Sequence, residues 1–93
     1  MYTEQVALGK ALLNKQKPQW RKKVDFNKLD MNSLAEDLLG QVFGDFHVGI
    51  RMLGLDHQQN LWDSAVKHGF YAGLNGDDDA LRVEWIAQML EEK

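Results

Sequence analysis

The chain has 93 residues, of which 44% are hydrophobic and 27% are charged, and its net charge is −3. These values are typical of one globular domain and exclude an intrinsically disordered chain. The absence of Cys excludes a disulfide framework, a thiolate zinc site and a cysteine nucleophile. No apolar run approaches the roughly 20 residues of a membrane-spanning helix, and no secretory signal opens the sequence. We therefore expect a cytoplasmic protein that does not contact the membrane.

Charge is distributed unevenly along the chain. Residues 1–31 hold seven basic and three acidic side chains, whereas residues 32–93 hold four basic and eleven acidic ones. Such a division predicts a dipolar surface that could steer a charged partner. Attraction between the two halves of the same molecule, together with solvation, is the alternative explanation.

The first predicted helix covers residues 4–16, with Thr3 as its N-cap. Gly9 is expected to weaken this helix by up to about 1 kcal/mol relative to Ala. Pro18 ends it, because the residue before a proline is pushed out of the helical region. Residues 17–32 then form a basic connector that is too long to remain loose in a compact domain. We expect it to be pinned to the core by its apolar side chains, Trp20, Val24, Phe26, Leu29 and Met31.

Two short helices are predicted in the middle of the chain. Ser33 and Glu36 have the spacing of a capping box, which opens a helix over residues 33–43. Gly44 is placed to end that helix in the left-handed region, and Asp45 to cap the next one. The helix over residues 46–54 is apolar on several sides, so we expect it to be the most buried element.

The last two helices are predicted over residues 57–68 and 78–91, with Asp56 and Asp77 as their N-caps. In the first of them Trp62 is expected to face inward, and Gly69 to end the helix. No segment alternates with the period of a strand. The sequence thus predicts a single all-α domain spanning 1–93, a compact bundle of about five short helices with an extended basic N-terminal connector.

Residues that could carry chemistry do not form a recognisable site. His47, His57 and His68 lie ten and eleven residues apart, whereas zinc sites commonly place two His four apart on one helical face. Ser64 and His68 have a spacing that permits contact, but a third orienting group is missing. The acids at 77–79 are contiguous, unlike the alternating ligands of a calcium loop, so a capping role explains them. We expect no enzyme activity, no cofactor and no metal.

Surface aromatic and basic residues are the strongest candidates for binding. Trp20 and Tyr71 lie in predicted connectors, where aromatic side chains are either exposed or used to pin a loop. Exposed aromatic residues beside Arg are typical of protein interfaces. The predicted partner-binding residues are therefore Trp20, Arg21, Lys22, Lys23 and Tyr71.

The segment Leu39-Gly40-Gln41-Val42-Phe43-Gly44-Asp45-Phe46 resembles a family of small proteins from actinobacteria and their bacteriophages. The resemblance covers about residues 9–87 and includes Lys17-Pro18-Gln19-Trp20, Leu53-Gly54-Leu55 and His68-Gly69-Phe70. The chain departs from the family pattern at Gln19, where Gly is expected, and in lacking a Cys shortly before Leu39. The resemblance implies no reaction.

These observations favour a small protein-interaction module, in one version a phage-encoded accessory protein that binds and modulates a host protein. Nucleic-acid binding through the basic arm of residues 10–28, with Trp20 as a stacking platform, is the alternative. Against it stands the acidic total charge, since nucleic-acid-binding domains are usually basic. A third hypothesis is a structural homodimer without a catalytic role, because a chain this small gains stability by dimerising.

Overall fold

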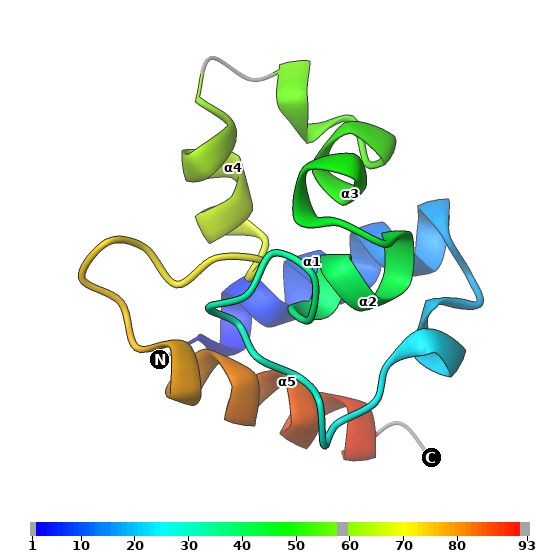
Figure 1. Ribbon diagram of the computed structural model, residues 1–93, viewed down its shortest axis with the longest axis vertical. Helices are drawn as coiled ribbons and strands as arrows, with labels where there is room; N and C mark the ends of the chain where they lie inside the picture. The colour runs from blue at the N-terminus through cyan, green and yellow to red at the C-terminus, as the bar shows by residue number, and fades with distance from the viewer. Residues whose placement is uncertain (1, 58–59, 92–93) are drawn as a thin grey trace.

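The computed structural model describes residues 2–57 and 60–91. Within these ranges the chain is all-α and has no strand, as the sequence predicts. The elements in chain order are α1 (Thr3–Gln16), the 3-10 turn η1 (Trp20–Lys23), α2 (Leu38–Phe43), α3 (Phe46–Met52), the 3-10 turn η2 (Leu55–His57), α4 (Leu61–Lys67) and α5 (Asp78–Glu91). The two longest helices, α1 and α5, pack against each other, and α2, α3 and α4 complete the bundle (Figure 1). None of the described helices is long and apolar enough to cross a membrane.

Helix α1 differs from prediction at its start and at Gly9. Thr3 is already helical, and Tyr2 occupies the N-cap position without a side-chain cap bond, so the prediction of Thr3 as cap is wrong. Gly9 is buried, and a Cβ there would lie 2.1 Å from the backbone oxygen of His68 and 3.0 Å from the Trp85 ring. Gly9 therefore allows α1 to pack closely against its neighbours, and is not simply a weak point of the helix.

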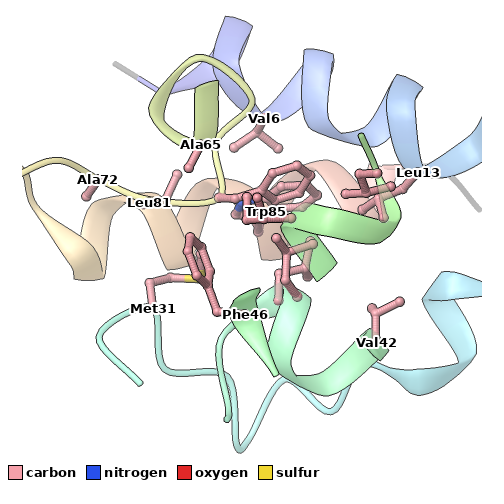
Figure 2. Packing of buried hydrophobic residues seen from close by; sticks show 14 of the residues in the cluster. Val6, Leu13, Met31, Val42, Phe46, Ala65, Ala72, Leu81 and Trp85 are labelled. Carbon is pink, nitrogen blue, oxygen red and sulfur yellow. The ribbon is translucent and has the colours of Figure 1, made fainter. Parts of the chain in front are cut away.

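Trp85 is the centre of the core (Figure 2). Its ring stacks on Phe70 with centroids 5.8 Å apart, and meets Trp20 edge to face at 5.9 Å. The indole N–H donates to the backbone oxygen of Gly69 over 2.6 Å, which satisfies its one polar atom in the interior. Aromatic residues from the connector, from the loop after α4 and from α5 thus share one apolar cluster.

The connector is anchored as predicted. After η1 it passes between α2 and α5 (Figure 1), and Leu29 and Met31 are buried along it. The Arg82 side chain of α5 donates hydrogen bonds to the backbone oxygens of Leu29, at 2.8 Å, and Phe26, at 3.2 Å. Pinning by side chains explains how a long stretch without an α-helix belongs to a compact fold.

The capping box predicted at Ser33 does not start a helix. The Ser33 hydroxyl accepts from the backbone N–H of Ala35 and Glu36, at 3.3 and 3.2 Å, but residues 34–36 form only turns. Helix α2 begins at Leu38, and its N-cap is Asp37, whose carboxylate accepts from the Gly40 N–H over 2.6 Å. Asp37, and not Ser33, is therefore the N-cap of this helix. The predicted start at residue 33 is wrong by about one helical turn.

The corner between α2 and α3 confirms the prediction. Gly44 has a φ of 94°, in the left-handed region, and the Asp45 side chain accepts from the N–H groups of His47 and Val48. Helix α3 ends at Met52 rather than at residue 54. The expectation that it is the most buried element is wrong, because three of its seven residues are buried against four of six in α2.

The next helix is shorter than predicted. Helix α4 begins at Leu61 and is capped by Asn60, whose side chain accepts from the N–H groups of Trp62 and Asp63. The prediction of Asp56 as its N-cap is therefore wrong, since Asp56 lies in η2. The expected helix also covers residues 58 and 59, which fall outside the described residues.

The ends of the last two helices agree with prediction. Gly69, with a φ of 72°, follows the end of α4. Helix α5 spans the predicted residues 78–91, and the Asp77 carboxylate accepts from the Ala80 N–H at 3.0 Å.

Candidate functional site

The predicted binding tryptophan lies in the interior. Trp20 is 0% exposed, and its indole N–H donates to the Asn14 side-chain oxygen at 2.9 Å. Of the two alternatives for Trp20, the structure confirms the one in which it pins the connector to the core, so Trp20 is not an exposed binding residue. The Arg21 guanidinium lies 4.6 Å from the centre of the Trp20 ring and also donates to Asn14, whereas Lys22 and Lys23 are exposed. The basic turn η1 remains at the surface, but its aromatic residue belongs to the core.

Another tryptophan occupies the surface instead. Trp62 of α4 is 42% exposed, so the prediction that it faces inward is wrong. Its ring lies 5.1 Å from that of Tyr71, at an interplanar angle of 57°. Tyr71 is half-buried, in the loop between α4 and α5. The structure thus places one predicted site residue, Tyr71, beside an exposed aromatic residue that sequence reasoning assigned to the core.

These two rings belong to a row of aromatic side chains from three elements. Trp62 stacks on Phe46 with centroids 5.4 Å apart and planes within 12°. The His47 ring meets both of them edge-on, at 5.4 Å from Phe46 and 5.8 Å from Trp62. Phe46 is buried, so the aromatic row formed by Phe46, Trp62 and Tyr71 leads from the interior to the surface.

Two hollows lie against the aromatic row and share Trp62 and Tyr71 as walls. The inner pocket has a volume of about 130 Å³ and is lined by Met31, Asn32, Ser33, Leu34, Asp37, Phe46, Trp62 and Tyr71. The outer cleft has a volume of about 520 Å³ and is lined by Asn60, Trp62, Asp63, Val66, Tyr71, Gly73, Leu74 and Asn75. Within the described part of the chain, each lining contains an Asp and neither contains Lys or Arg.

Asp37 supplies the only carboxylate of the inner pocket's lining among the described residues. It is 3% exposed, and burial raises the pKa of its carboxyl from 3.8 to about 7. The hydrogen bond from the Gly40 N–H opposes this rise, whereas the negative charges of Asp45 and Asp30 add to it. Asp37 is therefore the N-cap of α2, and its surroundings favour the protonated carboxyl over the carboxylate.

Acidic groups continue from Asp37 towards the start of α5. The pKa of the Asp78 carboxyl is raised by burial first, and then by the charges of Asp30, Asp77 and Asp79. Asp30 acts on both Asp37 and Asp78, so it connects the two groups electrostatically. Lys28 and Arg82 line the same hollow as Asp30 and Asp79, so the surface around these acids carries both signs of charge.

The histidines do not converge on a common site in the described residues. His47 packs on the aromatic row, and His68 stacks on Phe70 at 6.3 Å. The His68 ring nitrogen Nδ1 lies 2.8 Å from the backbone oxygen of Ser64, so the contact expected from their spacing involves the Ser64 carbonyl and not its hydroxyl. Among the side chains that the structure describes, no cluster of three or more His, Asp or Glu could hold a metal ion. The side chain of His57 lies outside the described set.

Sequence reasoning missed Asp37, Trp62 and Leu74 as surface or pocket residues. Leu74 is 95% exposed at the outer cleft. Its neighbours Asn75 and Gly76 mark a turn, which is the one local signal that could have suggested exposure. Comparison with known protein families, curated proteins and solved structures finds no match to this chain.

Proposed function

We propose that this protein is a small interaction module that binds a segment of another protein at the two hollows around Trp62 and Tyr71. The observation that carries the proposal is the exposure of large apolar side chains at these hollows. Leu34 is 49% exposed at the inner pocket and Leu74 is 95% exposed at the outer cleft, with Trp62 between them. Contiguous apolar surface beside shaped hollows is typical of protein interaction sites.

Charge defines the kind of segment that fits. Asp63 lines the outer cleft and Asp37 the inner pocket, while the described linings include no basic side chain. Complementary charge at the rim of an interface favours the matching partner and speeds association. The partner is therefore a segment with apolar side chains for the aromatic row and basic residues for its acidic surroundings. The sequence resemblance makes a host or phage protein its expected source.

The buried Trp20 weakens the case for nucleic-acid binding through the arm. Stacking of bases on an exposed aromatic ring was part of that alternative, and the Trp20 ring is covered. Lys22 and Lys23 can still contact phosphates, since both are exposed. These two lysines also provide a matched control, because they lie on η1 and line neither hollow.

A displayed library of random 12-residue peptides tests the proposal directly. We expect selection on the purified protein to enrich peptides with an aromatic or aliphatic residue near Lys or Arg. The synthesised peptides should shift the NMR signals of the Trp62 indole and the Tyr71 ring. Trp62→Ala should weaken their binding at least tenfold, whereas Lys22→Glu with Lys23→Glu should leave it within a factor of two. Peptides that bind Trp62→Ala normally, or that depend on the two lysines, would contradict the proposed site.

A further inference from the structure

The inner pocket differs from the outer cleft in containing a buried carboxylate among aromatic rings. Its volume of about 130 Å³ is well below the roughly 300–1,000 Å³ of pockets for small molecules and cofactors. The space therefore suits the tip of one side chain. Its walls combine the aromatic row with Asp37, Asn32 and Ser33, so they offer π-systems and hydrogen-bond acceptors together.

We propose that the inner pocket is a recognition site for the guanidinium group of an arginine on the partner segment, with Asp37 as its counter-ion. This inference rests on the proposed function, since it names the anchor of the same partner. An arginine guanidinium pairs with carboxylates and stacks on aromatic faces, and it is more weakly hydrated than an ammonium group. The lining includes one carboxylate and three aromatic side chains, so residue types for both kinds of contact are present.

The electrostatics of Asp37 agree with an incoming cation. Burial and the charges of Asp45 and Asp30 all disfavour the ionised carboxylate, and its hydrogen bond to the Gly40 N–H offsets them only in part. A guanidinium in the pocket would favour the ionised form and so lower the pKa of Asp37. Arg82 of α5 does not fill this role, because its side chain bonds to the backbone oxygens of Leu29 and Phe26.

Two probes of nearly the same shape separate charge from apolar contact. N-butylguanidinium carries the arginine head group, and N-butylurea is its neutral counterpart. Binding is followed by the NMR signals of the Trp62 indole and of the Asp37 carboxyl carbon. At pH 8 we expect the cation to bind at least fivefold more tightly than the urea. At pH 5 this preference should disappear, because Asp37 is then protonated.

Two variants make the test specific to Asp37. Asp37→Asn keeps an N-cap side chain for α2 and should abolish the preference for the cation while retaining the urea. Glu4→Gln removes an exposed carboxylate in the first turn of α1 that lines neither hollow, and it should leave the preference unchanged. If Asp37→Asn does not fold, the pH dependence of the cation preference in the unaltered protein still tests whether a carboxylate binds the cation.

Several outcomes overturn the inference. Equal binding of the two probes at pH 8 would show that the inner pocket binds apolar groups and does not recognise the cation. That result would not contradict the proposed interaction module. Binding of neither probe would overturn the arginine site, while the peptide selection would still judge the module separately. Tighter binding of free arginine than of its N-acetyl, N-methylamide derivative would point to a small-molecule ligand in place of a protein segment.

Discussion

The Trp62 and Tyr71 rings contact each other, with their centroids 5.1 Å apart, and this contact holds the loop after α4 against α4. The Tyr71 ring covers part of Trp62 on one side, and Phe46 stacks on it from the core. Trp62 is therefore fixed in orientation while 42% of it remains exposed. A rigid, partly exposed aromatic side chain loses little conformational entropy on binding, which suits an interface anchor.

The first prediction concerns which tryptophan solvent can reach. Trp20 and Trp85 are both fully buried, so the fluorescence of Trp62 should account for nearly all quenching by acrylamide. Trp62→Phe should remove the quenchable component, and Trp20→Phe should leave it in place. Loss of the quenching in Trp20→Phe would instead show that Trp20 is exposed and that the connector is not packed as described.

Gly9→Ala should destabilise the protein, although helix propensity alone favours Ala by up to about 1 kcal/mol. The added Cβ would lie 2.1 Å from the His68 oxygen, so α1 must shift away from that backbone. We expect a loss on the order of 1–3 kcal/mol in the free energy of unfolding, measured by urea denaturation.

Ala7→Gly on the exposed side of α1 is the control for Gly9→Ala, and it should cost about 0.5–1 kcal/mol through propensity alone. A more stable Gly9→Ala protein would show that α1 does not pack as closely as described.

The helix pattern could be predicted because local signals decide it. The turn at Gly44 and Asp45 needs only a residue that tolerates positive φ and a side chain that accepts two N–H groups. Competing caps were harder to resolve. Ser33 and Asp37 can each cap the start of a helix in this segment, and only the packed structure shows that α2 starts after Asp37.

The candidate site could be predicted only for Tyr71. Trp20 and Trp62 are equally apolar, and their exposure depends on contacts with distant parts of the chain. Trp20 meets Trp85, 65 positions later in the sequence, whereas Trp62 stacks on Phe46 and remains open on its other side. Periodicity on a short helix such as α4 gives too few turns to decide which face is covered.

Gln41 provides the next prediction, because its amide clamps the connector to α2. Its Nε2 donates to the backbone oxygens of Asp25, at 3.2 Å, and Glu36, at 3.1 Å, and its Oε1 accepts from the Asp25 N–H. Gln41→Glu would replace the donor by an oxygen that faces two carbonyls. We expect a loss of about 1–3 kcal/mol in stability at pH 8.

The control for the Gln41 clamp is Gln19→Glu, which adds the same charge at an exposed position of the connector. It should change stability by less than about 0.5 kcal/mol. Equal effects of the two substitutions would show that charge, and not the clamp, is responsible.

The raised pKa of Asp37 makes the protein less stable as the pH rises. The folded-state pKa, about 7, lies above the ordinary value of 3.8, so the folded protein holds this proton more tightly than the unfolded chain does. Its contribution to stability is fully present below about pH 4 and is lost as the pH rises towards 7. The shift corresponds to a change on the order of 4 kcal/mol between pH 4 and pH 8.

Comparison with Asp37→Asn isolates that contribution from the other carboxyl groups. The variant cannot titrate at this position and keeps a good cap, so its stability relative to the unaltered protein should increase between pH 4 and pH 8. Asp78 also has a raised pKa, and its titration occurs equally in both proteins and cancels.

A difference between Asp37→Asn and the unaltered protein that stays constant with pH would mean that Asp37 is ionised in the folded state throughout. The same measurement with N-butylguanidinium present should make the fall in stability of the unaltered protein smaller, because the cation stabilises the ionised carboxylate and so lowers its folded-state pKa.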